Sequence, residues 1–146
     1  MVRILLTGMS GAGKSTLLAE LTRRGHQTVE TDLDGWTDGN GGPWDEERMT
    51  VLLAGHPDVI VCGTAENQGR FRERFDQVVL LSAPIDVLID RVRARTDNPY
   101  GRTSAQQDEI RRYVRDVEPA LRRMATLELD GRRPVSELAD TVDALT

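Results

Sequence analysis

Lysine, cysteine, histidine and aromatic residues are all scarce in this 146-residue chain. The single cysteine, Cys62, excludes an intramolecular disulfide framework and a cysteine-rich metal site, and it fits a reducing cytoplasm. The histidines, His26 and His56, have no acid or cysteine at metal-ligand spacing, so neither is a catalytic candidate. No apolar stretch is long enough to cross a bilayer or to form a secretory signal. We therefore expect a cytoplasmic protein with no membrane partner.

The charge balance argues against nucleic acid as a partner. The formal net charge is −5, whereas affinity for a phosphate backbone comes mainly from Lys and Arg. Lys14 is the only lysine, so every other basic residue carries the planar fork that suits bidentate phosphate contacts. Genomic base composition could produce the same bias toward arginine. We expect a monomer or weak homodimer whose partners are small molecules.

Five short apolar segments alternate with segments that can hold helices, which predicts an α/β fold with a parallel sheet and helices on both faces. The expected strands are Arg3–Thr7, Thr28–Glu30, Val59–Cys62, Val78–Leu81 and Thr126–Leu129. No repeat or internal linker interrupts the pattern. The sequence therefore predicts a single domain over residues 1–146.

Helical spacing of apolar residues predicts a helix over Lys14–Arg24 and another from Pro84 to about Arg95. An arginine-rich segment predicts a third helix over Ser104–Arg123. Residues 96–103 and 35–48 are rich in Asp, Asn, Pro and Gly, a composition typical of loops. We expect the first of these loops to be a lid and the second to be a flap over a substrate.

A P-loop motif follows the first strand and opens the first helix. In this motif backbone N–H groups cradle phosphates, Lys14 reaches the β- and γ-phosphates, and the Ser15 hydroxyl ligates magnesium. Glycines let the backbone curl around the anion. The motif predicts ATP and Mg²⁺ as cofactors. The predicted nucleotide contacts are Gly8, Ser10, Gly11, Ala12, Gly13, Lys14, Ser15 and Thr16.

Two other classes of P-loop protein fit the sequence less well. A GTPase reads guanine through an Asn-Lys-x-Asp motif, which a chain whose only lysine is Lys14 cannot contain, although Asp32–Gly35 matches the shorter Asp-x-x-Gly pattern. A motor ATPase needs an acidic residue at the end of an apolar strand to hold magnesium and polarise water. The third and fourth strands lead instead into Gly63 and Ser82, so a hydrolytic motor is not expected.

The loop near the N-terminus, acids after the second strand and late lid arginines resemble the small P-loop kinases, above all shikimate kinases. The resemblance implies the three-layer P-loop NTPase fold with a five-stranded parallel sheet and a short lid. Glu30-Thr31-Asp32 matches the family's Asp-Thr-Asp, which implies that Glu30 lies near the metal and that Asp32 anchors the acceptor hydroxyl. A kinase needs such a carboxylate to orient the hydroxyl and accept its proton. A solvated acidic turn is the alternative reading.

Further segments extend the resemblance. The stretch from Arg95 to Arg102 matches the two lid arginines, one packing on adenine and one reaching the transferred phosphate. On a mobile loop, Arg102 can stabilise charge on that phosphate while excluding water. By the same resemblance, Arg122 implies an anchor for an anionic group of the acceptor, and Arg132 and Pro134 imply a border of the adenine site.

The sequence departs from the shikimate kinases at several acceptor positions. The family's glycine triplet is reduced here to Gly63 followed by Thr and Ala, and Gly63 is the expected substrate contact. Asp45 stands where the family has a carboxylate-binding arginine, a role that Arg48 could take. Arg70 has no counterpart in the family and is either a new substrate anchor or part of a surface salt bridge.

Three functions remain open on the sequence. The first is a shikimate kinase-like phosphotransferase, dependent on ATP and Mg²⁺, that acts on a hydroxyl of a small, anionic metabolite. The second is a nucleoside or nucleotide kinase of the same fold. The third is a non-catalytic nucleotide-binding protein. Arg102 and Asp32 favour an enzyme, and Arg122 together with the short flap favours a small acceptor.

Overall fold

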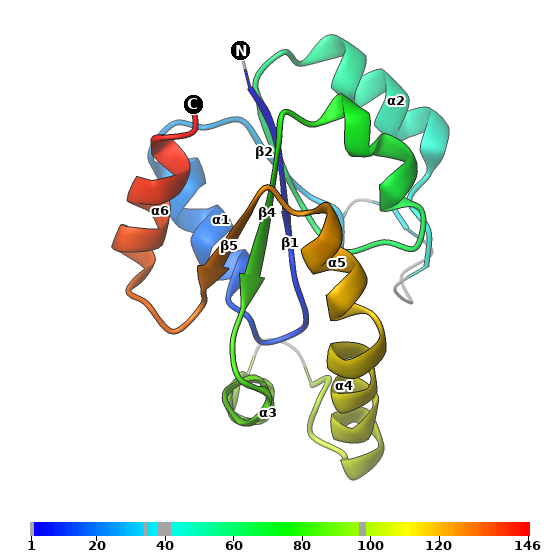
Figure 1. The fold of residues 1–146 in the computed structure, drawn as a ribbon, viewed down its shortest axis with the longest axis vertical. Coiled ribbons are helices and arrows are strands. Elements are labelled where there is room, and N and C mark those ends of the chain that lie inside the picture. The colour runs from blue at the N-terminus through cyan, green and yellow to red at the C-terminus, as the bar shows by residue number, and fades with distance from the viewer. Residues whose placement is uncertain (1, 34, 38–41, 97–98) are drawn as a thin grey trace.

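Five parallel strands form one sheet in the computed structural model, which describes residues 2–33, 35–37, 42–96 and 99–146. Their order across the sheet is β2-β3-β1-β4-β5 (Figure 1). All five predicted strands are confirmed to within one residue at each end. The strands are β1 Arg3–Thr7, β2 Thr28–Glu30, β3 Val59–Cys62, β4 Gln77–Ser82 and β5 Leu127–Asp130.

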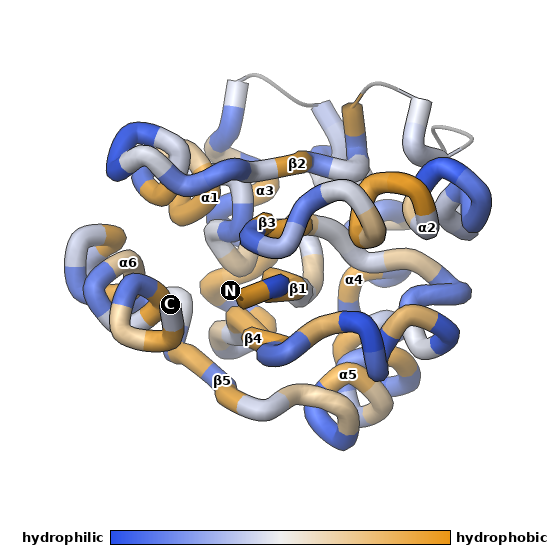
Figure 2. Tube along the Cα trace, turned by 90° about the horizontal axis from the view of Figure 1, so that it is seen from above, coloured by the Kyte–Doolittle hydropathy of each residue, from blue (hydrophilic) through white to orange (hydrophobic). Residues whose placement is uncertain are grey.

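Helices cover both faces of the sheet, as predicted. Figure 2 shows α1 and α6 on one face and α2, α4 and α5 on the other, while α3 lies beyond the end of β4 in Figure 1. Within the described ranges, no helix is long and apolar enough to cross a membrane. The helices are α1 Lys14–Arg23, α2 Glu46–Gly55, the 3₁₀ segment η1 Gln68–Arg74, α3 Ile85–Ala94, α4 Ser104–Asp116, α5 Glu118–Met124 and α6 Val135–Asp143.

The predicted helix over Ser104–Arg123 is wrong in one respect, because the segment forms two helices. Helix α4 ends at Asp116 and α5 begins at Glu118, with Val117 at the junction. Pro119 explains the break, because its nitrogen cannot donate a helical hydrogen bond and its ring would clash with the carbonyl one turn earlier. In the first turn of α5 this missing donor costs little.

Two apolar clusters hold the helices to the sheet, one on each face. Strands β3 and β4 are nearly continuous apolar runs, as expected for strands of a parallel sheet covered on both sides. One cluster packs Leu17, Leu21, Leu138 and Val142 of α1 and α6 against β1 and β4. The other packs Met49 and Leu53 of α2, with Phe71 and Phe75, against β1 and β3. This packing leaves the carboxyl ends of the strands for a ligand, the usual position in open α/β sheets.

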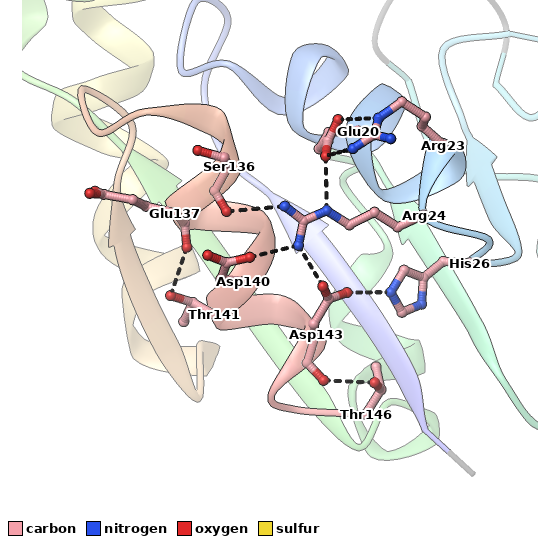
Figure 3. A network of polar contacts seen from close by, with 10 residues as sticks. All are labelled: Glu20, Arg23, Arg24, His26, Ser136, Glu137, Asp140, Thr141, Asp143 and Thr146. Carbon is pink, nitrogen blue, oxygen red and sulfur yellow. Dashed lines mark hydrogen bonds and ion pairs between the residues drawn. The ribbon is translucent and has the colours of Figure 1, made fainter.

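A polar network also joins α1 to the C-terminal helix α6 (Figure 3). At its centre, Arg24 donates to Glu20 at 2.8 Å, to Asp140 at 2.8 Å and to Asp143 at 2.6 Å. The His26 ring nitrogen Nε2 lies 2.6 Å from the other oxygen of Asp143. Because these residues come from opposite ends of the chain, the network ties its two ends together.

This network should make folding stability depend on pH in the acid range. Hydrogen bonds from Arg23 and Arg24 lower the pKa of Glu20 to about 2, and His26 followed by Arg24 lowers the pKa of Asp143. A carboxyl whose folded-state pKa is depressed stabilises the fold above its unfolded pKa, and this contribution is lost as pH falls through the folded value. We therefore expect the melting temperature to fall as pH drops from about 4.5 toward 2.

The expected dependence can be assigned to Arg24 by substitution. Arg24→Gln should lower the melting temperature at pH 7 by several degrees and flatten the decline in acid, because it removes contacts to two helices. Arg23→Gln is the control for the melting temperature at pH 7, since Arg23 contacts Glu20 of its own helix and is well exposed. Because Arg23 also lowers the pKa of Glu20, the acid dependence that distinguishes the two variants is the part that comes from Asp143. Calorimetry from pH 2 to 7 measures both variants. Equal behaviour of the two would show that the contacts between α1 and α6 contribute nothing.

Candidate functional site

The P-loop lies between β1 and α1 and curls around the N-terminal end of α1. Gly11 and Gly13 have φ values of 86° and 105°, which side chains other than glycine rarely adopt. The ammonium of Lys14 lies inside the turn and donates to the carbonyl oxygens of Gly8 at 2.6 Å and Met9 at 3.2 Å. Burial lowers the pKa of Lys14. The lysine is therefore held where a bound phosphate can replace the carbonyl oxygens.

The predicted metal residues meet beside this loop. The Ser15 hydroxyl donates to Oε1 of Glu30 at 2.6 Å, which joins the first turn of α1 to the end of β2. Asp32 follows β2, is exposed, and lies near enough to Lys14 to act on its pKa, as does Glu30. After burial, these carboxylates are among the groups that oppose its lowering. The structure thus brings Lys14, Ser15, Glu30 and Asp32 to one side of the P-loop.

The two predicted lid arginines also lie together. Arg102 donates to the carbonyl oxygen of Arg95 at 2.7 Å, and Arg95 donates to the carbonyl oxygen of Tyr100 at 3.2 Å. Arg95 also lies close enough to Lys14 to contribute to the lowering of its pKa, although burial is the larger cause. The predicted lid, residues 96–103, includes residues 97 and 98, which lie outside the described residues. Arg95, at the end of α3, therefore lies near the P-loop, and Arg102 contacts the main chain of Arg95.

A cleft of about 300 Å³ continues from the P-loop between α1, α3 and the loop after β5. Its lining residues are Gly13, Thr16, Arg91, Gly131, Arg133, Val135 and Leu138. The predicted adenine-border residue Arg132 is not among these lining residues, and the roles of Arg132 and Pro134 stay predictions. Arg132 pairs with Asp130 at 2.8 Å and lines a neighbouring cleft of about 350 Å³. Pro134 is the residue just before α6 and directly precedes Val135.

Polar side chains beneath the P-loop form a buried group that the sequence analysis missed. The Thr64 hydroxyl lies 2.8 Å from the Thr7 hydroxyl and donates to the carbonyl oxygen of Gly8 at 2.8 Å. Gln68 accepts from the Ala65 amide at 2.8 Å and points its amide nitrogen at Thr7, 3.4 Å away. Short polar residues after a strand give no sequence signal for this role. These contacts fix the start of the P-loop.

Gly63 and Cys62 have structural reasons for their identities. A Cβ on Gly63 would lie 1.9 Å from the Thr31 hydroxyl oxygen, so only glycine fits where the chain leaves β3 beside the end of β2. Cys62 is buried at the end of β3, and burial raises the pKa of its thiol to about 12. The thiol is therefore protonated at neutral pH and packs as a core residue, as predicted. Substrate contact by Gly63 stays a prediction.

The flap contributes two aromatic side chains to the core cluster on the α2 face of the sheet. Trp36 and Trp44 are both buried, and the Arg48 guanidinium lies 4.0 Å from the centre of the Trp36 ring. Residues 38–41 of the flap lie outside the described residues. Arg70 is exposed and donates to Glu46 at 3.0 Å, an arrangement that matches the predicted alternative of a surface salt bridge. Arg48 therefore packs against Trp36, a flap residue that follows Asp32 in the chain.

Arg122 lies at the other side of the sheet. It donates to Glu128 of β5 at 2.8 Å and to Glu118 at 3.0 Å, and these bonds raise its pKa further. Since β5 and β2 are the two edge strands, four strand spacings or roughly 19 Å separate them. Asp32 follows β2. The structure therefore does not bring Arg122 and Asp32 together, and an acceptor contact by Arg122 stays a prediction.

The comparison with known families identifies the family to which most of the chain belongs. A family model described as an AAA domain matches residues 4–112, from β1 into α4. This match covers more than half of the chain. The chain belongs to this family. No curated protein is significantly similar to it in sequence. Among its strands, β3 and β4 end at Cys62 and Ser82, so this member of the AAA domain family lacks the carboxylate of the motor ATPases at both positions.

Solved structures confirm the fold of this AAA domain protein. Shikimate kinase from Acinetobacter baumannii, in complex with shikimate, is 21% identical with a TM-score of 0.70, over 99% of this chain and 92% of that one. A sugar kinase from Janibacter sp. is 21% identical with a TM-score of 0.62, over 99% and 93% of the two chains. A gluconokinase from Sinorhizobium meliloti is 20% identical with a TM-score of 0.60, over 98% and 90%. The chain therefore has the P-loop kinase fold that shikimate kinases share.

Proposed function

We propose that this protein is an ATP- and Mg²⁺-dependent phosphotransferase that acts on a hydroxyl of a small, anionic metabolite. The observation that carries the proposal is the meeting of four side chains at one side of the P-loop: Lys14, the hydrogen-bonded pair Ser15 and Glu30, and the nearby Asp32. Phosphoryl transfer needs a phosphate-binding cation, a magnesium ligand and a carboxylate for the nucleophile. Each of these needs is met by a residue present here.

The triphosphate would lie along the P-loop with its base in the adjoining cleft. The loop amides and Lys14 would hold the β- and γ-phosphates, and Thr16 lines the path toward the base. Val135 and Leu138 give the cleft an apolar wall against which a purine can pack. Arg102, next to Arg95, would stabilise charge on the γ-phosphate as the bond to the leaving ADP lengthens.

The residues fit magnesium bound together with nucleotide. Among the described residues, no group of three or more His, Cys, Asp or Glu side chains is arranged to hold a metal ion. Magnesium in kinases is commonly held by one or two protein oxygens together with phosphate oxygens and waters. The Ser15 hydroxyl and Glu30 are the residues that would hold it here. When bound, Mg²⁺ neutralises charge on the β- and γ-phosphates.

The acceptor hydroxyl would meet Asp32. In the reaction, the hydroxyl oxygen forms a bond to the γ-phosphorus, the bond from phosphorus to the β-γ bridging oxygen breaks, and Asp32 accepts the hydroxyl proton. An anionic group on the acceptor needs a cation nearby. Arg48, stacked on Trp36, lies in the flap that follows Asp32, whereas Arg122 lies at the opposite edge of the sheet. We therefore place the anion beside Arg48.

A screen for ADP release tests this proposal. The purified protein with MgATP is assayed against sugars, hydroxy acids, cyclic polyol acids, nucleosides and nucleotides. We expect a compact hydroxylated acid to be the best acceptor, with the emission of Trp36 and Trp44 changing more on acceptor binding than on ATP binding. Preference for an uncharged nucleoside would contradict an anion-binding acceptor site. A complete lack of acceptor-dependent ADP release across the panel would count against the kinase function.

Three variants then locate the acceptor. Asp32→Asn should lower kcat by about 10²-fold or more, since it removes the proton acceptor. Arg48→Ala should raise the acceptor KM with a smaller change in kcat, because an anion anchor binds ground state and transition state alike. Arg122→Ala tests the alternative anchor at the edge of β5, whose predicted acceptor contact would raise the acceptor KM instead. A larger effect of Arg122→Ala than of Arg48→Ala would return the anion site to the edge of β5.

A further inference from the structure

Arg91 of α3 joins two loops through their main-chain carbonyl groups. One guanidinium nitrogen, Nη1, donates to the carbonyl oxygens of Gly11 at 3.2 Å and Ala12 at 3.1 Å, both in the P-loop. The other, Nη2, donates to the carbonyl oxygen of Gly131 at 2.8 Å, in the loop after β5. A single side chain therefore connects the phosphate-binding loop to the loop after β5, which borders the 300 Å³ cleft.

The two loops are in close contact where Arg91 joins them. A Cβ on Gly131 would lie 2.4 Å from the carbonyl oxygen of Ala12, so the residue at this position must lack a side chain. The amide of Gly131 donates to the carbonyl oxygen of Ser82 at 2.7 Å, which holds the same loop to the end of β4. The loop after β5 is thus pressed against the P-loop, with Arg91 bonded to both.

Arg91 also lines the 300 Å³ cleft, together with Gly13 and Arg133. Bonding to carbonyl groups on two loops at once requires donors in a fixed planar fork, which arginine has and lysine lacks. No oxyanion is needed for these bonds. Arg91 is therefore part of the wall between the phosphate-binding loop and the cleft. The shape of this wall is set before any ligand enters.

We propose that Arg91 is a positioning residue that sets the spacing between the phosphate-binding loop and the base-binding cleft. The inference rests on the proposed binding of a nucleoside triphosphate at the P-loop. Its consequence concerns selectivity. With the spacing fixed, a ligand that carries both phosphates and a base fills both sites at once. Without Arg91, the phosphates still bind the P-loop amides and Lys14, but the cleft is no longer held at the matching distance.

The test compares a nucleotide with a bare polyphosphate. Calorimetric titrations with Mg²⁺ measure Kd for ADP and for inorganic tripolyphosphate in the wild type, Arg91→Met, Arg91→Lys and Arg93→Met. We expect Arg91→Met to weaken ADP binding by roughly tenfold or more and tripolyphosphate binding by less than about threefold. Arg91→Lys should weaken ADP binding nearly as much, because it keeps the charge and loses the fork. Arg93 is exposed on the same helix, so Arg93→Met should match the wild type.

The remaining outcomes separate this inference from the proposed function. Equal losses for both ligands would overturn it, since Arg91 would then act on the phosphate loop alone. Unchanged ADP binding in Arg91→Met or Arg91→Lys would overturn it as well. If the wild type binds neither ligand, the proposed function fails too. Circular dichroism and melting curves establish that each variant is folded. If Arg91→Met does not fold, the comparison of ADP with tripolyphosphate is made with Arg91→Lys alone.

Discussion

Replacing Lys14 by alanine should abolish phosphoryl transfer, with a loss in kcat/KM of about 10³-fold or more. The Lys14 ammonium already lies inside the P-loop, 2.6 Å from the carbonyl oxygen of Gly8. A phosphate that enters the loop would take the place of these carbonyl contacts. Since Lys14 is the only lysine in the chain, no other ammonium can substitute for it. Coupled assay of ADP release with the best acceptor measures the loss.

The fold should tolerate this change. The Thr64 hydroxyl also donates to the carbonyl oxygen of Gly8, at 2.8 Å, so that carbonyl stays hydrogen-bonded when the ammonium is removed. We expect the melting temperature of Lys14→Ala to stay close to that of the wild type. Lys14→Arg is a second control, in which charge is kept and shape is changed. Near-normal turnover in a folded Lys14→Ala variant is incompatible with a catalytic P-loop.

Arg102→Ala should lower kcat by about 10³-fold while changing ATP affinity little. In the absence of nucleotide Arg102 is exposed and donates to the carbonyl oxygen of Arg95. Its contact with the γ-phosphate would form mainly as charge develops in the transition state, and an interaction made only there acts on kcat. Steady-state kinetics together with titration of a non-hydrolysable ATP analogue, which keeps the γ-phosphate, separate the two effects.

Arg111→Ala is the matched control for Arg102. Arg111 is another exposed arginine in the same part of the chain, and it pairs with Asp108 of its own helix at 2.8 Å. Its loss should leave kcat and ATP affinity unchanged. If Arg102→Ala instead weakened ATP binding strongly with kcat intact, Arg102 would belong to ground-state nucleotide binding and the lid would have no catalytic part.

The strands were predictable because a parallel sheet covered on both faces requires short, continuous apolar runs. Val59–Cys62 is such a run, and the structure confirms both of its ends. The junction at Val117 was missed because the arginine-rich segment has helical spacing on both sides of Pro119. A proline that is harmful within a helix is acceptable in the first turn of a new one. The periodic pattern alone does not separate these two cases.

The candidate site was predictable where the backbone carries the chemistry. The P-loop motif and its following helix place Lys14 and Ser15 directly, and the hydrogen bond from Ser15 to Glu30 joins two residues that were predicted separately. Arg91 and Thr64 were missed, because both act on main-chain carbonyl oxygens that have no sequence signature. Long-range ion pairs such as that of Arg122 with Glu128 likewise depend on which strands lie at the sheet edges.

The most direct test of the central claim is protection of Lys14 from acylation. Burial lowers the pKa of Lys14, which increases the fraction of its amine that is unprotonated at a given pH. As the sole lysine, Lys14 is the only side chain that such a reagent can label at an amine, and peptide mapping distinguishes it from the N-terminal amine. We predict that MgATP blocks labelling of Lys14 and leaves labelling of the N-terminus unchanged. Labelling of Lys14 that occurs in the nucleotide-free protein and is unchanged by saturating MgATP would contradict nucleotide binding at this P-loop.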